Sequence, residues 1–319
     1  MRCCPLGDKL GGTKAPEPSP ERLILPLFVT TGTGRRIQSE AIEGVKTLSV
    51  DLLVEAVDKA ISAGVMSFLL FGHYEEDAKD SSGTPASDPG GPVQEALRRL
   101  TSQFDKAVLY THISLSHATD HGLNFCPGPS GAPDMEKTRK RFLAIAESHL
   151  EAGAHGVIPL FLEKGFVRLL RSTMDTRGFS DRTILSYGAK FDSALYGPFN
   201  TSTSVSEKGM PREQIDPSDG KAASSKAVAD IEEGASELII KPALPYLDII
   251  AKFRRDFAIP LVGWLVSGEY MMIKAAAAHN VFDEKRTVLE FHQCLFRAGV
   301  DRIITYDAIR LARWLRGKE

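Results

Sequence analysis

The sequence predicts an α/β protein built as a closed (β/α)8 TIM barrel with a short N-terminal arm. Short, almost continuously apolar segments alternate with amphipathic helical patterns from Glu21 onward, and such strands are typical of a parallel sheet buried on both faces. Eight strand-helix units in about 290 residues favour a closed barrel over an open, doubly wound sheet, which is the alternative. We expect a flexible arm over residues 1–20 and a catalytic barrel over residues 21–319.

The predicted strands are apolar runs that turn or loop residues separate from the helices. In chain order they are Leu23–Val29, Met66–Phe71, Ala107–Ser114, His155–Leu160, Thr183–Lys190, Glu237–Lys241, Pro260–Val266 and Asp301–Tyr306. The stretch Gly72–Pro92 is rich in Asp, Ser, Gly and Pro and is predicted as a long loop. Barrel enzymes place functional residues in loops of this kind, which follow the C-terminal end of a strand.

The predicted helices carry apolar residues at helical spacing. They are Val50–Ala63, Val93–Phe104, Asp134–Ala152, Glu163–Thr173, Ser225–Glu233, the region Ile273–Ala278, and Glu284–Ala298. The first of them has recognisable ends, because Ser49 is a suitable N-cap and Gly64 a suitable stop.

Composition narrows the possible partners. A net charge of −2 gives no electrostatic reason to bind nucleic acid or an acidic membrane, and runs such as Leu23–Val29 are too short to span a bilayer. The four cysteines, Cys3, Cys4, Cys126 and Cys294, match neither a disulfide framework nor a zinc ribbon. Residues 1–20 lack the apolar segment of a secretory signal. We expect a cytoplasmic protein whose partners are small molecules and copies of itself.

Two lysines close neighbouring predicted strands, Lys190 and Lys241. In a barrel both lie at the C-terminal face, where active sites are built. Burial and a second nearby cation each disfavour a charged amine, and a neutral amine attacks a carbonyl to form a Schiff base. Ser267 and Tyr306 end the next two predicted strands and are expected on the same rim, as hydrogen-bond donors to a carboxylate or carbonyl. A pair of ordinary surface lysines is the alternative.

Several segments resemble the porphobilinogen synthase (5-aminolevulinate dehydratase) family, from about Leu23 to Leu315. They are Ser-Tyr-Gly-Ala-Lys-Phe from Ser186, Tyr-Gly-Pro-Phe from Tyr196, Lys-Pro-Ala-Leu-Pro-Tyr from Lys241, Val-Ser-Gly-Glu-Tyr from Val266, and Ile-Ile-Thr-Tyr from Ile303. The resemblance implies a TIM barrel that joins two molecules of 5-aminolevulinate into a pyrrole with loss of two waters. It also implies homo-octamers with swapped N-terminal arms, although the short arm here makes a dimer plausible as well.

The resemblance also implies roles for individual residues. Lys241 would form the Schiff base with the first substrate, and Lys190 would bind the second substrate or tune its neighbour. Ser267 and Tyr306 would hold the first substrate's carboxylate. Two further residues are expected to bind substrate together with Ser267 and Tyr306. They are Tyr196, in the Tyr-Gly-Pro-Phe segment, and Gln214, in the Gln-x-Asp-Pro segment.

The metal-binding segment departs from this pattern. Many members carry three metal-binding cysteines after the third strand, where this chain has Ser114, Ser116 and Asn124, and His112 replaces the preceding aspartate. Serine and asparagine are poor zinc ligands, so we expect no metal and no cofactor. A new metal site formed by His112, His117, Asp120 and His121 is the less favoured alternative, because their spacing matches no motif with a known mechanism.

The second-substrate segments depart as well. The family has two arginines in its lid, and here the first position is Asn200 while the second falls near Met210 and Pro211. Asparagine cannot replace the charge of an arginine, although Lys208 or Arg212 offers a substitute. The family's Ala-Pro-Ser-Asp segment is apolar here, as Ile-Pro-Leu-Phe from Ile158.

These features leave three functional hypotheses. The first is a Schiff-base-forming condensing lyase that acts on 5-aminolevulinate or a similar keto acid with an altered second substrate. The second is an ordinary porphobilinogen synthase of tetrapyrrole biosynthesis. The third is a catalytically inactive paralogue with a binding or regulatory role, which the presence of both Lys190 and Lys241 disfavours.

Overall fold

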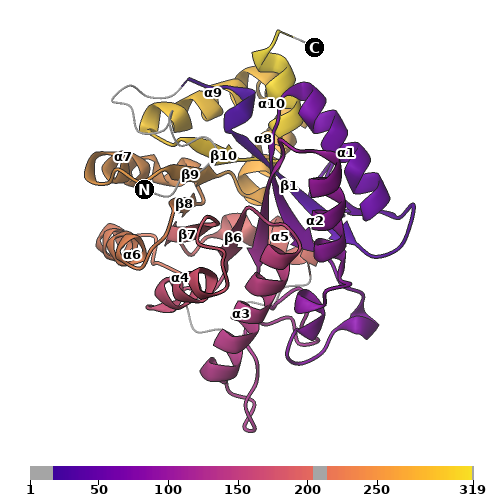
Figure 1. Ribbon diagram of the computed structural model, residues 1–319. Helices are drawn as coiled ribbons and strands as arrows, with labels where there is room; N and C mark the ends of the chain where they lie inside the picture. Colours follow the sequence, from indigo (N-terminus) through magenta and orange to yellow (C-terminus); the bar gives the residue numbers. More distant parts are fainter. Residues whose placement is uncertain (1–16, 204–213, 318–319) are drawn as a thin grey trace.

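The computed structural model describes residues 17–203 and 214–317 (Figure 1). Eight parallel strands follow one another around a closed ring, because β10 pairs with both β9 and β1. They are β1 Leu23–Thr30, β4 Ser67–Gly72, β5 Val108–Ile113, β6 Gly156–Pro159, β7 Thr183–Lys190, β8 Glu237–Lys241, β9 Leu261–Trp264 and β10 Arg302–Ile304. The predicted (β/α)8 barrel is confirmed.

Helices surround the barrel (Figure 1). They are α1 Val50–Ala63, α2 Pro92–Gln103, α3 Met135–Glu151, α4 Phe166–Thr176, α5 Gly197–Thr203, α6 Gly220–Glu232, α7 Leu247–Asp256, α8 Ser267–Ala278, α9 Glu284–Ala298 and α10 Ala308–Leu315. The end signals of α1 are confirmed: Ser49 is its N-cap residue and Gly64 ends it with a positive φ of 98°. The predicted long loop after β4 contains two short 3-10 turns, Glu76–Ala78 and Thr84–Ser87.

Some predicted helix boundaries were wrong. Helix α4 starts at Phe166 rather than Glu163, because Gly165 holds a left-handed conformation at its N-cap. Helix α6 starts at Gly220 rather than Ser225, because the Asp219 side chain accepts a hydrogen bond from the Ala222 N–H. The prediction also missed α5, α7 and α10. Helix α7 begins directly after a proline-rich segment, whose composition resembles a loop.

The sequence analysis also missed a small hairpin outside the barrel. Strands β2 (Arg36–Gln38) and β3 (Lys46–Ser49) pair antiparallel, and β3 continues the sheet beside the end of β1. All three residues of β2 are exposed. Such a strand has no buried face, so it carries no alternation of apolar and polar residues that a sequence could reveal.

The apolar core has two layers. One fills the barrel interior and the other lies between the strands and the helices. Alternate residues of each strand point inward, as Leu69 and Phe71 do on β4. A buried ion pair joins Arg302 to Glu237, and the Arg302 guanidinium also donates to the Tyr110 hydroxyl over 2.6 Å. The charged groups nearest the start of the strands therefore stabilise one another inside the barrel.

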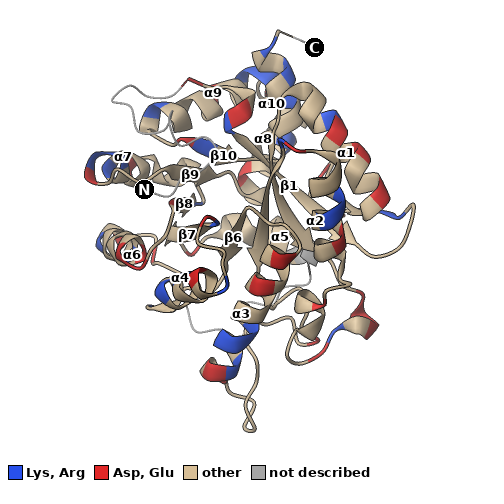
Figure 2. Ribbon diagram, viewed as in Figure 1, with Lys and Arg blue, Asp and Glu red and all other residues tan. Residues whose placement is uncertain are grey.

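The outer surface carries both signs of charge. Figure 2 shows lysine, arginine, aspartate and glutamate interspersed over the helices and loops, with no single-sign face in this view. Among residues 17–203 and 214–317, no helix is both long enough and apolar enough to cross a membrane. Most of the predicted arm, residues 1–16, lies outside the described residues, and Pro20–Arg22 forms a 3-10 turn before β1.

Candidate active site

The structure brings Lys190 and Lys241 together at the C-terminal end of the barrel. The two residues are direct partners in the parallel pairing of β7 with β8. Both ammonium nitrogens lie 5.4 Å from the centroid of the Tyr196 ring. These positions agree with the site expected from the sequence.

An irregularity in β7 accounts for the direction of Lys190. Leu185 and Tyr187 point into the barrel, and strict alternation would turn residue 189 inward as well. The register between β7 and β8 shifts between Ser186 and Ala189, however, and Ala189 packs in the outer layer. The shift therefore turns Lys190 toward the barrel mouth.

Aromatic rings enclose the Lys241 amine. Its nitrogen lies 3.7 Å from the centroid of Trp264, 5.6 Å from Tyr187 and 5.8 Å from Phe199. Burial holds the pKa of Lys241 well below its usual range of about 10.5, and the charge of Lys190 lowers it further. Although aromatic faces attract a cation, desolvation dominates here. The lowered pKa favours the neutral amine, which is the form that Schiff-base chemistry requires.

Glu269 is a site residue that the sequence analysis quoted but did not assign. Its carboxyl accepts hydrogen bonds from the Leu244 N–H over 2.7 Å and the Val266 N–H over 2.6 Å. Burial raises its pKa to about 7, against these hydrogen bonds and the charge of Lys241. Glu269 fixes the loop after β8 to the start of α8, and its position in Val-Ser-Gly-Glu-Tyr was the available signal.

Two predicted carboxylate-binding residues lie near strand ends but not in strands. Ser267 is the first residue of α8, and its buried hydroxyl accepts a hydrogen bond from the Phe199 N–H over 3.0 Å. Tyr306 follows β10, and its ring centroid lies 5.4 Å from that of Tyr270. The predicted strands seven and eight were therefore too long, because α8 begins earlier and β10 ends earlier than expected.

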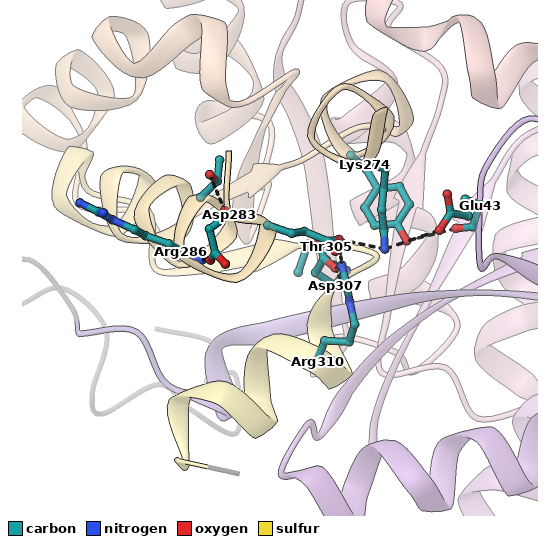
Figure 3. Close-up of polar contacts among 10 residues, drawn as sticks. Glu43, Lys274, Asp283, Arg286, Thr305, Asp307 and Arg310 are labelled. Carbon is teal, nitrogen blue, oxygen red and sulfur yellow. Dashed lines mark hydrogen bonds and ion pairs between the residues drawn. The ribbon is translucent and has the colours of Figure 1, made fainter. Parts of the chain in front are cut away.

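Charged side chains support the Tyr306 side of the mouth (Figure 3). Arg310 forms ion pairs with Asp307 and, over 2.8 Å, with Glu284. Lys274 lies 2.9 Å from the Glu284 carboxylate and 3.8 Å from that of Glu43 in the hairpin region. These contacts link α8, α9 and α10 to the segment that carries Tyr306.

The remaining predicted substrate-binding residues are Tyr196 and Gln214. The Tyr196 hydroxyl lies 2.9 Å from the carbonyl oxygen of Phe191 and 3.0 Å from that of Lys241. Its ring, rather than its hydroxyl, therefore faces the lysines. The Gln214 side-chain oxygen is buried and has no hydrogen-bond partner within the described residues. Their roles in substrate binding stay predictions.

The three positions that replace metal-binding cysteines lie together but do not suit zinc. The Ser114 hydroxyl is 2.9 Å from that of Ser116 and donates to the Asn124 side-chain oxygen over 3.0 Å, and the same oxygen accepts from the Leu115 N–H. The Asn124 amide donates to the Leu160 carbonyl. The three side chains thus form hydrogen bonds within the protein, and none of them is the thiolate or imidazole that zinc prefers. The absence of zinc remains a prediction.

The alternative histidine site is not assembled either. The ring centroids of His112 and His117 are 6.0 Å apart, whereas His121 stacks on Phe125 and lies 3.3 Å from the Ser81 carbonyl oxygen. Within the part of the chain that the structure describes, no three His, Cys, Asp or Glu side chains are placed to hold a metal ion.

At the positions that the resemblance links to a second substrate, the described residues offer neither an arginine nor a carboxylate. Asn200 lies in α5, and Lys208 and Arg212 lie outside the described residues. Ile158 lies in β6 and belongs to the barrel interior, and Phe161, just after the strand, is buried in the outer layer. The end of β6 therefore presents apolar side chains where the resemblance led us to look for an acidic one.

Comparisons with known proteins agree with this geometry. The family described as delta-aminolevulinic acid dehydratase matches residues 13–314. A protein of that name from Streptomyces coelicolor is 37% identical over 93% of this chain and 91% of its own length. Another from Halalkalibacterium halodurans is 39% identical over 92% of this chain and 89% of its own length.

A solved structure shows the same fold. The Toxoplasma gondii delta-aminolevulinic acid dehydratase, in complex with its reaction product porphobilinogen, superposes with a TM-score of 0.89 and 33% sequence identity. The match covers 95% of this chain and 87% of that chain. The family resemblance seen in the lysine-bearing segments is therefore confirmed over nearly the whole chain.

Proposed function

Because the chain belongs to the delta-aminolevulinic acid dehydratase family, we propose that it is a Schiff-base-forming lyase that condenses two molecules of 5-aminolevulinate to porphobilinogen. The observation that carries the proposal is the Lys190–Lys241 pair at the mouth of the barrel. Relatives at 37–39% identity carry the dehydratase name, which favours this ordinary activity over the altered-substrate hypothesis. Tetrapyrrole biosynthesis is the pathway that the product serves.

Each lysine has a separate part in the proposed mechanism. The neutral Lys241 amine attacks the keto carbon of the first substrate, and loss of water leaves the Schiff base. Ser267 and Tyr306 hold the carboxylate of that substrate. Lys190 lowers the pKa of Lys241 by its charge and faces the place where the second substrate binds. Both amines lie 5.4 Å from the centroid of the Tyr196 ring.

Borohydride trapping tests the assignment of the lysines. Reduction in the presence of 5-aminolevulinate should fix an adduct on Lys241, and peptide mass mapping should locate it. Lys241→Met should abolish the adduct, whereas Lys190→Met should slow catalysis and leave some trapping. An adduct on Lys190 in the wild-type protein would reverse the two roles.

A condensing lyase with an altered second substrate is the second candidate function. The observations that favour it are the missing lid arginines and the apolar end of β6. Charge-assisted hydrogen bonds contribute roughly 1.5–3 kcal/mol each, so the loss of two arginines weakens carboxylate binding by about 3–6 kcal/mol, or two to four orders of magnitude. On this hypothesis 5-aminolevulinate forms the Lys241 adduct without efficient self-condensation. Porphobilinogen formation at about 1 per second or faster would exclude it.

Restoring one lid cation separates the two candidates further. Asn200→Arg should increase porphobilinogen formation at low substrate by about 10- to 150-fold if the missing arginine limits second-substrate binding. Asn200→Gln is the matched control, since it adds length without charge. A turnover that is already high and unchanged by Asn200→Arg would favour the ordinary enzyme.

We also propose a homo-oligomer, between a dimer and an octamer, in the cytoplasm. The oligomeric character of the family supports the assembly, and the free thiols of Cys126 and Cys294 agree with a reducing compartment. Light scattering coupled to size-exclusion chromatography will measure the mass of the assembly, and a monomer at micromolar concentration would contradict it.

A further inference from the structure

His112 faces the barrel interior at the level of the catalytic lysines and has no part in the mechanism above. It is buried on β5, and its Nε2 atom lies 3.2 Å from the Tyr187 hydroxyl oxygen. The Tyr187 ring in turn lies 5.6 Å from the Lys241 nitrogen and stacks on Trp264. Tyr187 therefore contacts His112 with its hydroxyl and faces the Schiff-base amine with its ring.

A small polar cavity borders the other side of His112. It measures about 10 Å³, close to the space of one water molecule, and Ser114, His117 and His149 also line it. The buried His149 ring has no hydrogen-bond partner on either nitrogen within the described residues. Polar walls of this kind favour a bound water, so His112 has a place beside it for a water with which its proton can exchange.

The resting state of the pair follows from burial. Desolvation lowers the pKa of His112 well below 6.5, and the facing groups His117, Lys241, Lys190 and His149 lower it further. Burial raises the pKa of Tyr187 well above 10. At neutral pH the imidazole is therefore uncharged and the phenol is protonated, so the Tyr187 hydroxyl can donate to Nε2 of His112.

We infer that Tyr187 and His112 form the acid–base pair that removes a proton from the substrate carbon beside the Schiff base. The inference rests on the proposed Schiff base at Lys241. Tyr187 is the catalytic residue in this scheme, because its ring lies 5.6 Å from the Lys241 nitrogen that would carry the substrate, and His112 acts through it as a positioning residue and final proton acceptor. The resemblance to the family did not assign either residue, and His112 stands where many members carry an aspartate.

The step balances without an external reagent. The C–H bond next to the iminium carbon breaks, its electron pair forms the C=C bond of the enamine, and the iminium π electrons return to the nitrogen. The proton passes to the Tyr187 oxygen while the hydroxyl proton passes to Nε2 of His112. Tyr187 stays neutral and His112 becomes an imidazolium. Reversal after exchange with water places solvent hydrogen on the substrate carbon.

Hydrogen exchange into 5-aminolevulinate measures this step apart from condensation. The full-length protein is incubated with 5-aminolevulinate in D2O, deuterium beside the keto group is followed by NMR against a protein-free sample, and borohydride trapping is measured in parallel. His112→Asn should leave trapping at Lys241 within about threefold of wild type and slow exchange by about 10²- to 10⁴-fold. Tyr187→Phe should do the same, and the double variant should be little slower than either single one.

Matched variants separate proton transfer from packing. His117→Asn changes a neighbouring histidine that lines the same cavity, and it should leave exchange within about threefold of wild type. His112→Asp should recover much of the exchange, because a carboxylate also accepts the tyrosine proton. A purely structural role of His112 would not be rescued in this way.

The outcomes distinguish this inference from the proposed function. Intact trapping with unchanged exchange in His112→Asn or Tyr187→Phe would overturn the acid–base pair and leave the Schiff base in place. Absence of a Lys241 adduct in the wild-type protein would overturn both. If His112→Asn does not fold, Tyr187→Phe tests the same pair, since it removes only the hydroxyl.

Discussion

Replacing Ser114, Ser116 and Asn124 by cysteine should create a zinc site. Their side-chain oxygen atoms lie 2.9–3.0 Å apart along the chain of contacts. Three sulfurs around a tetrahedral zinc with bonds of about 2.3 Å lie roughly 3.8 Å apart, and the longer C–S bonds of cysteine make such a spread accessible. The fourth position would take water, as in zinc sites that keep one open ligand.

The magnitude follows from the contacts removed and the ion gained. The loss of four hydrogen bonds costs roughly 0.5–1.5 kcal/mol each. Zinc at 1,000 times its dissociation constant stabilises the folded state by about 4 kcal/mol. The metal-free triple variant should therefore melt below wild type, and zinc should raise its melting temperature by roughly 5–10 °C.

The assay combines zinc analysis with thermal unfolding before and after dialysis against a chelator. The triple variant should hold one zinc per chain, whereas wild type should hold far less and keep its activity in the chelator. Asn124→Cys alone is the control, because one thiolate cannot hold the ion. A folded triple variant that binds no zinc, or a wild-type protein with stoichiometric zinc, would refute the argument that these positions lost their metal with their thiolates.

Three further predictions concern stability. Arg302→Met should lower the free energy of unfolding in urea by about 3–5 kcal/mol, because it leaves Glu237 buried without its partner, and the added change Glu237→Leu should recover much of the loss. The pKa of Glu269 rises from 4.5 to about 7 on folding, so its contribution to the free energy of unfolding is present below pH 4.5 and is lost as the pH rises through 7. Across this range the free energy of unfolding of wild type should fall by roughly 3 kcal/mol relative to that of Glu269→Gln. Equal dependence of the two proteins on pH would contradict the raised pKa. Lys241→Met should be more stable than wild type at pH 7, because burial opposes the charged amine in the folded state. This difference in stability should disappear as the pH approaches 10.5. A variant that is less stable than wild type at pH 7 would show that the lysine packs favourably.

The sequence predicted the strand-borne part of the site well. The bounds of β7 and β8 agree with the predicted strands, and Lys190 and Lys241 lie opposite one another as the barrel requires. This success has a simple cause, because a strand buried on both faces leaves a largely apolar run in the sequence, and here each run ends at a lysine. A residue that ends such a run in the sequence therefore lies at the C-terminal rim of the barrel.

Other features depend on tertiary contacts that one strand does not encode. The register shift that turns Lys190 inward arises between two strands. The raised pKa of Glu269 depends on its burial beneath the loop after β8. The ring of Trp264 lies against the Lys241 amine only once β8 and β9 are adjacent. Composition and periodicity carry no signal for such contacts.

The two lysines that match the family lie on barrel strands, whereas several residues that depart from it lie in a loop or a short helix. Lys241 and Tyr187 stand on strands, where the closed sheet holds each side chain in place. The replaced residues Ser116 and Asn124 stand in a loop, and Asn200 stands in the short helix before the lid. Loops and short surface elements change their residues with little effect on the fold. In the proposed mechanism, the Schiff-base chemistry therefore depends on the barrel, and the binding of a second substrate depends on the rim. Cysteines in the loop alone should therefore create a metal site without changing second-substrate binding, which on the altered-substrate hypothesis responds only to Asn200→Arg.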